Sequence, residues 1–161
     1  MRIAFDFDET IIDYIDDFKK WSVSPQALKL MLKLLEGKHQ VFIVTARCPA
    51  LSRKNIHSRS YICPTRHRAL TRAFNGIVRY LDLPTVEGFV KEYLPKELAG
   101  AVTIIYTDGA LKGSFLADEG IELLIDDSEE QRADALKHHI SAVHPADIEP
   151  LIRQLKEIGV F

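Results

Sequence analysis

The most informative stretch of the chain is Arg2-Ile3-Ala4-Phe5-Asp6-Phe7-Asp8-Glu9-Thr10. Its continuous apolar run predicts a strand that is buried on both faces, as strands of parallel sheets are. Side chains two residues apart on a strand share a face, so we expect Asp6 and Asp8 to point at one place. Two close carboxylates repel unless a cation neutralises them, and a hard divalent cation such as Mg²⁺ takes oxygen ligands.

Similar apolar runs recur along the chain and predict further buried strands. They cover Gln40–Thr45, Ala101–Tyr106 and Glu122–Asp126, with a weaker run at Ile140–His144.

Helical patterns separate these predicted strands. One begins at Ser24-Pro25 and ends at Gly37, one runs from the capping box at Ser128 to about Lys137, and one follows Asp147 as its cap. Strands that alternate with helices predict an α/β domain with a doubly wound, Rossmann-like parallel sheet. In such domains ligands bind at the carboxyl ends of the strands.

One segment departs from this alternation. About 55 residues separate the second and third predicted strands, more than one crossover helix requires. Arg66–Leu81 has helical spacing, and Thr85–Leu98 is expected to form one or two shorter helices. We therefore expect a single domain over residues 1–161, with 46–100 as a basic, largely helical insertion or lid.

The composition excludes several classes of protein. With 47% apolar residues, 27% charged residues and a net charge of −2, it is that of an ordinary soluble globular protein. The two cysteines are too few for a disulfide scaffold and favour the cytoplasm. No apolar run approaches the roughly 20 residues of a membrane span, so we expect no membrane partner.

A second acidic pair, Asp126-Asp127, ends the predicted strand at 122–126. In a parallel sheet it emerges at the same edge as Asp6 and Asp8. Carboxylates gathered at strand ends cost stability and therefore indicate a site. The alternative is that each pair only caps the helix that follows it.

Two further residues fit the same chemistry. Thr45 brings a hydroxyl to the end of another predicted strand, where it could hold a phosphoryl oxygen. Lys112 lies 14 residues before Asp126, at an expected helix start, and its ammonium can offset clustered negative charge.

In this order the residues resemble the four signature motifs of the haloacid dehalogenase superfamily. The motifs are DxDxT at 6–10, Thr45 after its apolar strand, Lys112, and Asp126-Asp127. The resemblance spans residues 1 to about 130, and it implies a phosphatase of the small-cap or capless type. Members that hydrolyse carbon–halogen bonds lack the second acid of motif one, so Asp8 favours a phosphatase over a dehalogenase.

The resemblance also implies roles for these residues. Asp6 would attack phosphorus and form an aspartyl-phosphate, while Asp8 would protonate the leaving oxygen and then activate water. Thr45 and Lys112 would bind the transferring phosphoryl group.

The implied metal ion is Mg²⁺. It would be held by the Asp6 carboxylate, the Asp8 main-chain carbonyl and Asp126, with Asp127 in support. Glu9 stands where many family members have Gly or another small residue. We count Glu9 and Arg47 as candidate substrate contacts.

The segment 46–81 holds eight Lys or Arg and no Asp or Glu, which leaves −10 on the rest of the chain. It could meet a polyanion, with Tyr61, Phe74 and Tyr80 available for base stacking. It could equally be a solvated helix whose arginines pair with acids elsewhere.

Two cysteines and two histidines lie within this segment and could form a structural zinc site, although their spacing matches no familiar finger. Buried thiols and solvated imidazoles are the default interpretation. The four residues are Cys48, His57, Cys63 and His67.

These observations predict a Mg²⁺-dependent phosphomonoester hydrolase that acts on a nucleotide or another small phosphate ester. One alternative is a phosphatase for nucleic-acid ends that uses the basic segment. The other is a non-catalytic binding module that retains the fold.

Overall fold

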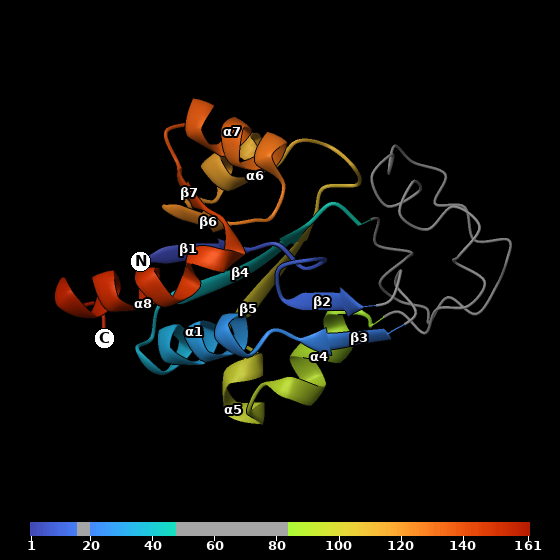
Figure 1. The fold of residues 1–161 in the computed structure, drawn as a ribbon, viewed down its shortest axis with the longest axis vertical. Coiled ribbons are helices and arrows are strands. Elements are labelled where there is room, and N and C mark those ends of the chain that lie inside the picture. The colour runs from blue at the N-terminus through green and yellow to red at the C-terminus, as the bar shows by residue number, and fades with distance from the viewer. Residues whose placement is uncertain (16–19, 48–83) are drawn as a thin grey trace, which may run out of the picture.

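The computed structural model describes residues 1–15, 20–47 and 84–161. Its centre is a five-stranded parallel sheet with the strand order β5-β4-β1-β6-β7 (Figure 1). All five runs that the sequence predicted as strands belong to it. The strands are β1 (Arg2–Phe5), β4 (Gln40–Thr45), β5 (Val102–Tyr106), β6 (Leu123–Ile125) and β7 (Ser141–Val143).

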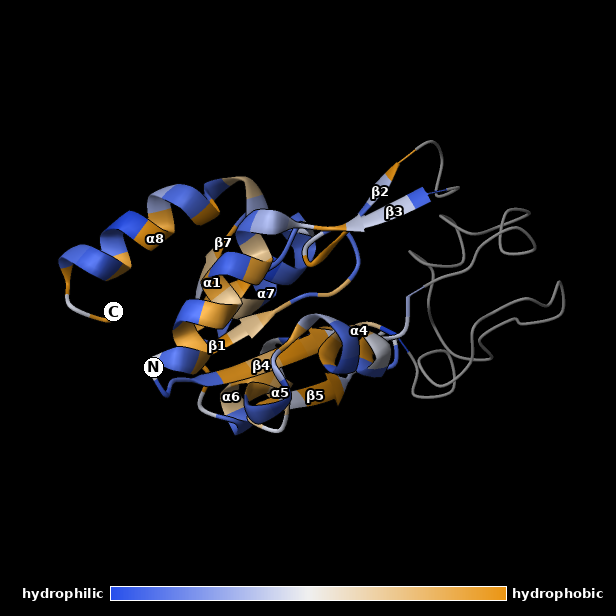
Figure 2. Cartoon of the chain, turned by 90° about the horizontal axis from the view of Figure 1, so that it is seen from below, coloured by the Kyte–Doolittle hydropathy of each residue, from blue (hydrophilic) through white to orange (hydrophobic). Residues whose placement is uncertain are grey.

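Helices pack against both faces of the sheet. The larger core cluster joins Ile3 and Phe5 of β1 to α1 (Pro25–Glu36), α4 (Val86–Tyr93) and α8 (Ile148–Glu157). On the other face, a smaller cluster joins the sheet to α6 (Gly113–Asp118) and α7 (Glu129–Lys137). The colouring in Figure 2 shows apolar strands between helices whose outer faces are polar. A mixed α/β fold with a helix-covered parallel sheet, consistent with a Rossmann-like domain, is therefore confirmed.

The predicted helix starts agree with the structure at two of three places. The Ser24 side chain accepts a hydrogen bond from Ala27 N, and the Ser128 side chain accepts one from Gln131 N. The last helix does begin directly after Asp147, but that side chain forms no capping hydrogen bond. A short 3₁₀ helix, η2 (Pro145–Asp147), precedes α8 instead, and it is capped by His144.

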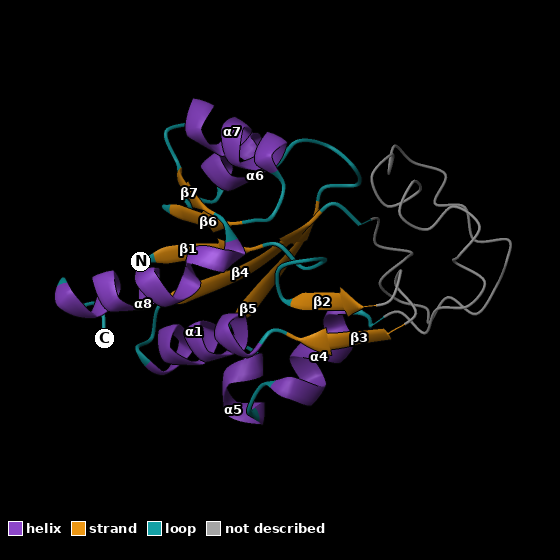
Figure 3. Ribbon diagram, in the orientation of Figure 1, coloured by secondary structure: helices purple, strands orange, loops and turns teal. Residues whose placement is uncertain are grey.

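An antiparallel hairpin between β1 and α1 was not predicted from the sequence. It consists of β2 (Ile12–Ile15) and β3 (Lys20–Val23), and its register pairs Tyr14 with Trp21 (Figure 3). The hairpin follows the acidic stretch after β1, and Ser24 N donates to Ile11 O to close its base. Tyr14 is thereby placed beside the end of β1.

Part of the predicted insertion is described. Residues 86–99 form two short helices as expected, α4 and α5 (Lys96–Ala99), and the Thr85 side chain caps the first by accepting from Gly88 N. The expected helix at 66–81, nearly all of the basic segment and the Cys/His set lie outside the described residues. Within the ranges that the structure describes, no helix has both the length and the apolar character to cross a membrane.

The topology places the ends of β1 and β6 side by side at the edge where a ligand is expected. The register pairs Phe5 of β1 with Ile43 of β4 and with Ile125 of β6. Asp6 N then donates to Ile125 O at 2.8 Å, so the residues after both strands stay together. After β1, the chain adds β4 and β5 on one side of β1 and then β6 and β7 on the other side. The position between β1 and β6 is therefore the topological switch point of the sheet.

Candidate functional site

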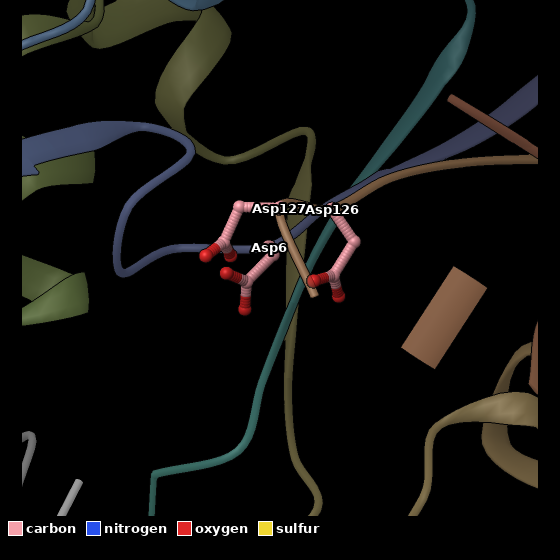
Figure 4. Close-up of side chains that lie close together, drawn as sticks. All are labelled: Asp6, Asp126 and Asp127. Atoms are coloured by element: carbon pink, nitrogen blue, oxygen red, sulfur yellow. The ribbon is translucent and has the colours of Figure 1, made fainter. Parts of the chain in front are cut away.

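Three carboxylates meet where β1 and β6 end. Asp6 follows β1, and Asp126 and Asp127 follow β6. One ligand oxygen from each lies within 4.8 Å of the others, and Figure 4 shows the three side chains gathered in one place. Asp6 and Asp126 are buried, while Asp127 is partly exposed. The sequence prediction that the two acidic motifs lie at the same edge of the sheet agrees with this arrangement.

Lys112 is the cation that holds this group together. Its Nζ lies 2.5 Å from Asp6 Oδ1 and 2.6 Å from Asp126 Oδ2, and its side chain is only 1% exposed. Burial disfavours the ammonium, but the charges of Asp6 and Asp126 outweigh burial and raise the pKa of Lys112 to about 12. The lysine therefore stays charged at physiological pH.

Burial and mutual repulsion disfavour the charged forms of two of the carboxylates, Asp6 and Asp127. Burial raises the pKa of Asp6 well above its usual value, and Asp126 and Asp127 add to this effect while Lys112 opposes it. Burial and the charge of Asp126 also raise the pKa of Asp127. The three carboxylates form a group that could hold a metal ion. An all-oxygen donor set of this kind fits a hard divalent ion such as Mg²⁺.

Thr10 and Thr45 complete the buried part of the site. The Thr10 hydroxyl donates to Asp6 Oδ2 at 3.4 Å. Thr45, the last residue of β4, is 1% exposed, and its hydroxyl oxygen accepts from Arg47 N at 3.2 Å. Thr45 thus lies at the end of the strand next to β1, as the sequence predicted.

The Asp8 carboxylate is not a member of the three-carboxylate group and has partners of its own. Its carboxylate accepts from Arg47 Nε at 2.8 Å, from Arg47 Nη2 at 2.6 Å and from the Tyr14 hydroxyl at 2.5 Å. The strand alternation from which we expected Asp6 and Asp8 to point at one place does not extend to these residues, because β1 ends at Phe5. Beyond it the chain turns, with Ile11 N and Ile12 N both donating to Phe7 O, so the two-residue alternation of a strand no longer applies.

The Asp8 carboxylate is held in its charged form. Burial opposes that charge, but Arg47 outweighs burial, and with Tyr14 it lowers the pKa of Asp8 below its usual value. The suggested role of the Asp8 main-chain carbonyl in binding metal stays a prediction.

Arg47 is a fully buried guanidinium that joins three parts of the chain. Besides its two bonds to Asp8, its Nη1 donates to Pro84 O at 2.7 Å, and its guanidinium carbon lies 4.8 Å from the centre of the Phe7 ring. All three guanidinium nitrogens are therefore bonded to the protein itself. This geometry favours a role in fixing Asp8 over the predicted direct contact with substrate.

Glu9 lies at the exposed side of the group. Its backbone adopts φ 63°, a left-handed conformation that glycine tolerates best. Partial burial, together with the charges of Asp127 and Asp8, raises the pKa of the Glu9 carboxyl to about 7. The contact with substrate predicted for Glu9 stays a prediction.

Several residues with no recognised role in the sequence contact this site. Arg132 Nη1 donates to Asp126 O at 2.8 Å and to Asp127 O at 2.7 Å. Gln131 and Asp134 accept hydrogen bonds from the main chain at Lys112 and Gly113. In the sequence these residues read as an ordinary polar helix, because their partners lie on other elements.

Comparison with known proteins adds no relative. The chain matches no protein-family model, and no curated protein matches it.

Proposed function

We propose that this protein is a Mg²⁺-dependent phosphomonoester hydrolase of the haloacid dehalogenase type, working through an aspartyl-phosphate at Asp6. The observation that carries the proposal is the position of Lys112 Nζ, which is bonded to both Asp6 and Asp126, two members of the group that Asp127 completes. These residues come from three separate parts of the chain. They are the residues that three of the four motifs single out.

The carboxylates of Asp6, Asp126 and Asp127 would hold the metal ion. When bound, the ion supplies positive charge against the phosphoryl oxygens. Lys112 contributes a fixed ammonium beside Asp6, where the negative charge of a transferring phosphoryl group would develop. The hydroxyl of Thr45 offers a donor at the end of the neighbouring strand.

The reaction proceeds in two steps. A carboxylate oxygen of Asp6 forms a bond to phosphorus, and the bond from phosphorus to the leaving oxygen breaks as that oxygen takes a proton from the protonated form of Asp8. In the second step, water attacks phosphorus and gives a proton to the Asp8 carboxylate, while the bond from phosphorus to Asp6 breaks. The bonds from Arg47 favour the charged form of Asp8, so the second step uses its major form and the first step draws on its minor, protonated form.

The substrate that we favour is a nucleotide or another small phosphate ester. The eight basic residues of 46–81 support one second candidate, the phosphorylated end of a nucleic acid. The two differ in salt dependence, because an extended polyanion loses affinity steeply as ionic strength rises and a mononucleotide loses much less.

The test is phosphate release from mononucleotides, sugar phosphates and end-phosphorylated oligonucleotides, each with Mg²⁺ and with EDTA. We expect release with Mg²⁺, no release with EDTA, and loss of release in Asp6→Asn. Asp118→Asn is the matched control because Asp118 is an exposed aspartate at the end of α6. Release that survives in Asp6→Asn, or that does not depend on a divalent cation, would contradict the proposal.

A further inference from the structure

Helix α7 is unusual in how it attaches to the protein. Surface helices commonly bury a stripe of apolar residues, but the buried residues of α7 are Ala135 and the charged Asp134. Leu136, the one large apolar residue of α7, is 60% exposed. In Figure 1 α7 packs beside α6, and the sequence of α7 is almost wholly polar. Polar contacts must therefore account for much of its attachment.

Those contacts hold the start of α6. Lys112 occupies the N-cap position of α6, and its side chain makes no capping bond because an ammonium has no acceptor atom; it donates to the carboxylate group instead. Helix α7 supplies the missing acceptors. Gln131 Oε1 accepts from Lys112 N at 2.9 Å, and Asp134 Oδ2 accepts from Gly113 N at 2.7 Å. Two N–H groups that would otherwise be unsatisfied at the start of α6 are thus bonded from a neighbouring helix.

The close approach of the two helices depends on Gly113. A Cβ atom there would lie 2.4 Å from Asp134 Oδ2 and 2.2 Å from His138 Nδ1, distances that real contacts do not show. His138 is itself fixed, because its Nδ1 lies 2.9 Å from Asp134 O. The residue after Lys112 is therefore fitted against α7 with no room for a side chain.

The same helix also holds the acidic pair. Arg132 bonds to the carbonyl oxygens of both Asp126 and Asp127, and Asp126 Oδ1 accepts from Ser128 N at 2.9 Å. Helix α7 therefore contacts the backbone that carries Lys112 and the backbone that carries Asp126. Their side chains then meet at 2.6 Å.

We infer that α7 positions the ammonium of Lys112 next to the carboxylate of Asp126. In this inference Gln131, Arg132 and Asp134 are positioning residues of the phosphatase site. It deepens the proposed function and rests on it for its catalytic part. Its structural part, the coupling between Asp134 and Lys112, stands independently of any reaction.

The test is a double-mutant cycle with Asp134→Ala and Lys112→Met. If Asp134 acts through Lys112, then Asp134→Ala lowers kcat by roughly 10- to 100-fold and changes KM by less than about threefold. In the Lys112→Met background, Asp134→Ala then changes the residual activity by less than about twofold. Asp134→Asn, which keeps an oxygen acceptor, restores most of the loss. Equal losses of kcat in both backgrounds would overturn the inference, because a purely structural role acts independently of Lys112.

A second readout needs no activity. Urea unfolding of the same four proteins gives the fold-change in the unfolding equilibrium constant that each variant causes relative to the wild type. The fold-change of the double variant should differ from the product of the two single-variant fold-changes by about fivefold or more. Additive effects would overturn the inference even if the protein is a phosphatase. If the protein releases no phosphate from any substrate, this cycle still decides the coupling, so the two failures are distinguishable.

Two further variants protect the test against misfolding. Gln131→Ala removes only the acceptor for Lys112 N from a half-buried position, and we expect a smaller loss of kcat in the same direction. Asp147→Ala is the matched control, because Asp147 is an exposed aspartate before α8 whose side chain makes no capping bond. A loss of kcat in Asp147→Ala as large as in Asp134→Ala would contradict the assignment.

Discussion

Replacing Lys112 with methionine should destabilise the protein in a way that depends on pH and on divalent cations. Methionine keeps much of the length and the apolar stem of the side chain but removes the ammonium that bonds to Asp6 and Asp126 at 2.5 and 2.6 Å. Removing one partner of a buried ion pair typically costs about 3–5 kcal/mol, because the other charge stays buried and unpaired. Here three carboxylates lose their ammonium, so we expect the upper part of that range near pH 8.

The pH dependence follows from the same charges. The pKa of Lys112 is raised from 10.5 to about 12, so its stabilising effect is complete below its unfolded pKa and is lost only as the pH rises through about 12. In Lys112→Met the carboxylates can relieve their repulsion by taking up protons. The cost of the substitution should therefore shrink toward pH 4 and be greatest at neutral and alkaline pH.

Urea unfolding of the wild type and Lys112→Met at pH 4 and pH 8, in EDTA and in excess Mg²⁺, measures these effects. Mg²⁺ at 100 times its dissociation constant stabilises by about 2.7 kcal/mol, so it should restore part of the loss at pH 8. Lys29→Met is the control, because Lys29 forms a half-exposed ion pair with Glu149 and should cost no more than about 1 kcal/mol. A cost for Lys112→Met below about 1 kcal/mol at pH 8, or one that is the same at both pH values, would refute the reasoning.

Two more predictions concern residues at the margin of the site. The pKa of Glu9 is raised from 4.5 to about 7, so ionising this group destabilises the fold as the pH rises through that range. Glu9→Gln should accordingly raise the melting temperature at pH 8 relative to the wild type and leave it unchanged at pH 4, whereas a gain that is equal at both pH values would argue against a charge effect. Arg47→Met should cost about 3–5 kcal/mol in urea unfolding at pH 7, because the Asp8 carboxylate then lies without its guanidinium. The stabilisation from Asp8 is present above its unfolded pKa and disappears as the pH falls through its lowered folded pKa. The free energies of unfolding of the wild type and Arg47→Met should therefore become equal in acid. A difference that persists in acid would show that lost packing explains the cost instead.

The sheet and most of the helices could be predicted from the sequence because their signals are local. A strand buried on both faces requires a continuous apolar run, and Val41–Val44 has one whatever its neighbours are. Ser24 and Ser128 mark helix starts because a serine side chain bonds to a backbone N–H only three residues away. The acidic motifs could be placed at one edge because parallel strands end together.

What the sequence did not predict depends on contacts between distant residues. Asp8 faces Arg47, which lies 39 positions away, and the turn after Phe5 that directs it there has no strand periodicity. The β2–β3 hairpin has strands of only four residues each, the shortest length at which alternation of apolar and polar residues can indicate a strand. The role of the polar residues of α7 likewise depends on their hydrogen bonds to the start of α6, and nothing in the sequence of α7 itself indicates that partner.

The central claim is that Asp6 is the nucleophile, and trapping the phosphorylated protein tests it most directly. The wild type, mixed with Mg²⁺ and p-nitrophenyl phosphate and quenched in acid within a turnover, should carry one phosphoryl group. Mass spectrometry should locate that group at Asp6, within the tryptic peptide of residues 3–19, and hydroxylamine should remove it. Asp6→Asn should carry none. A phosphoryl group on any other residue, or phosphate release at a normal rate with no phosphorylated protein at any quench time, would contradict the account.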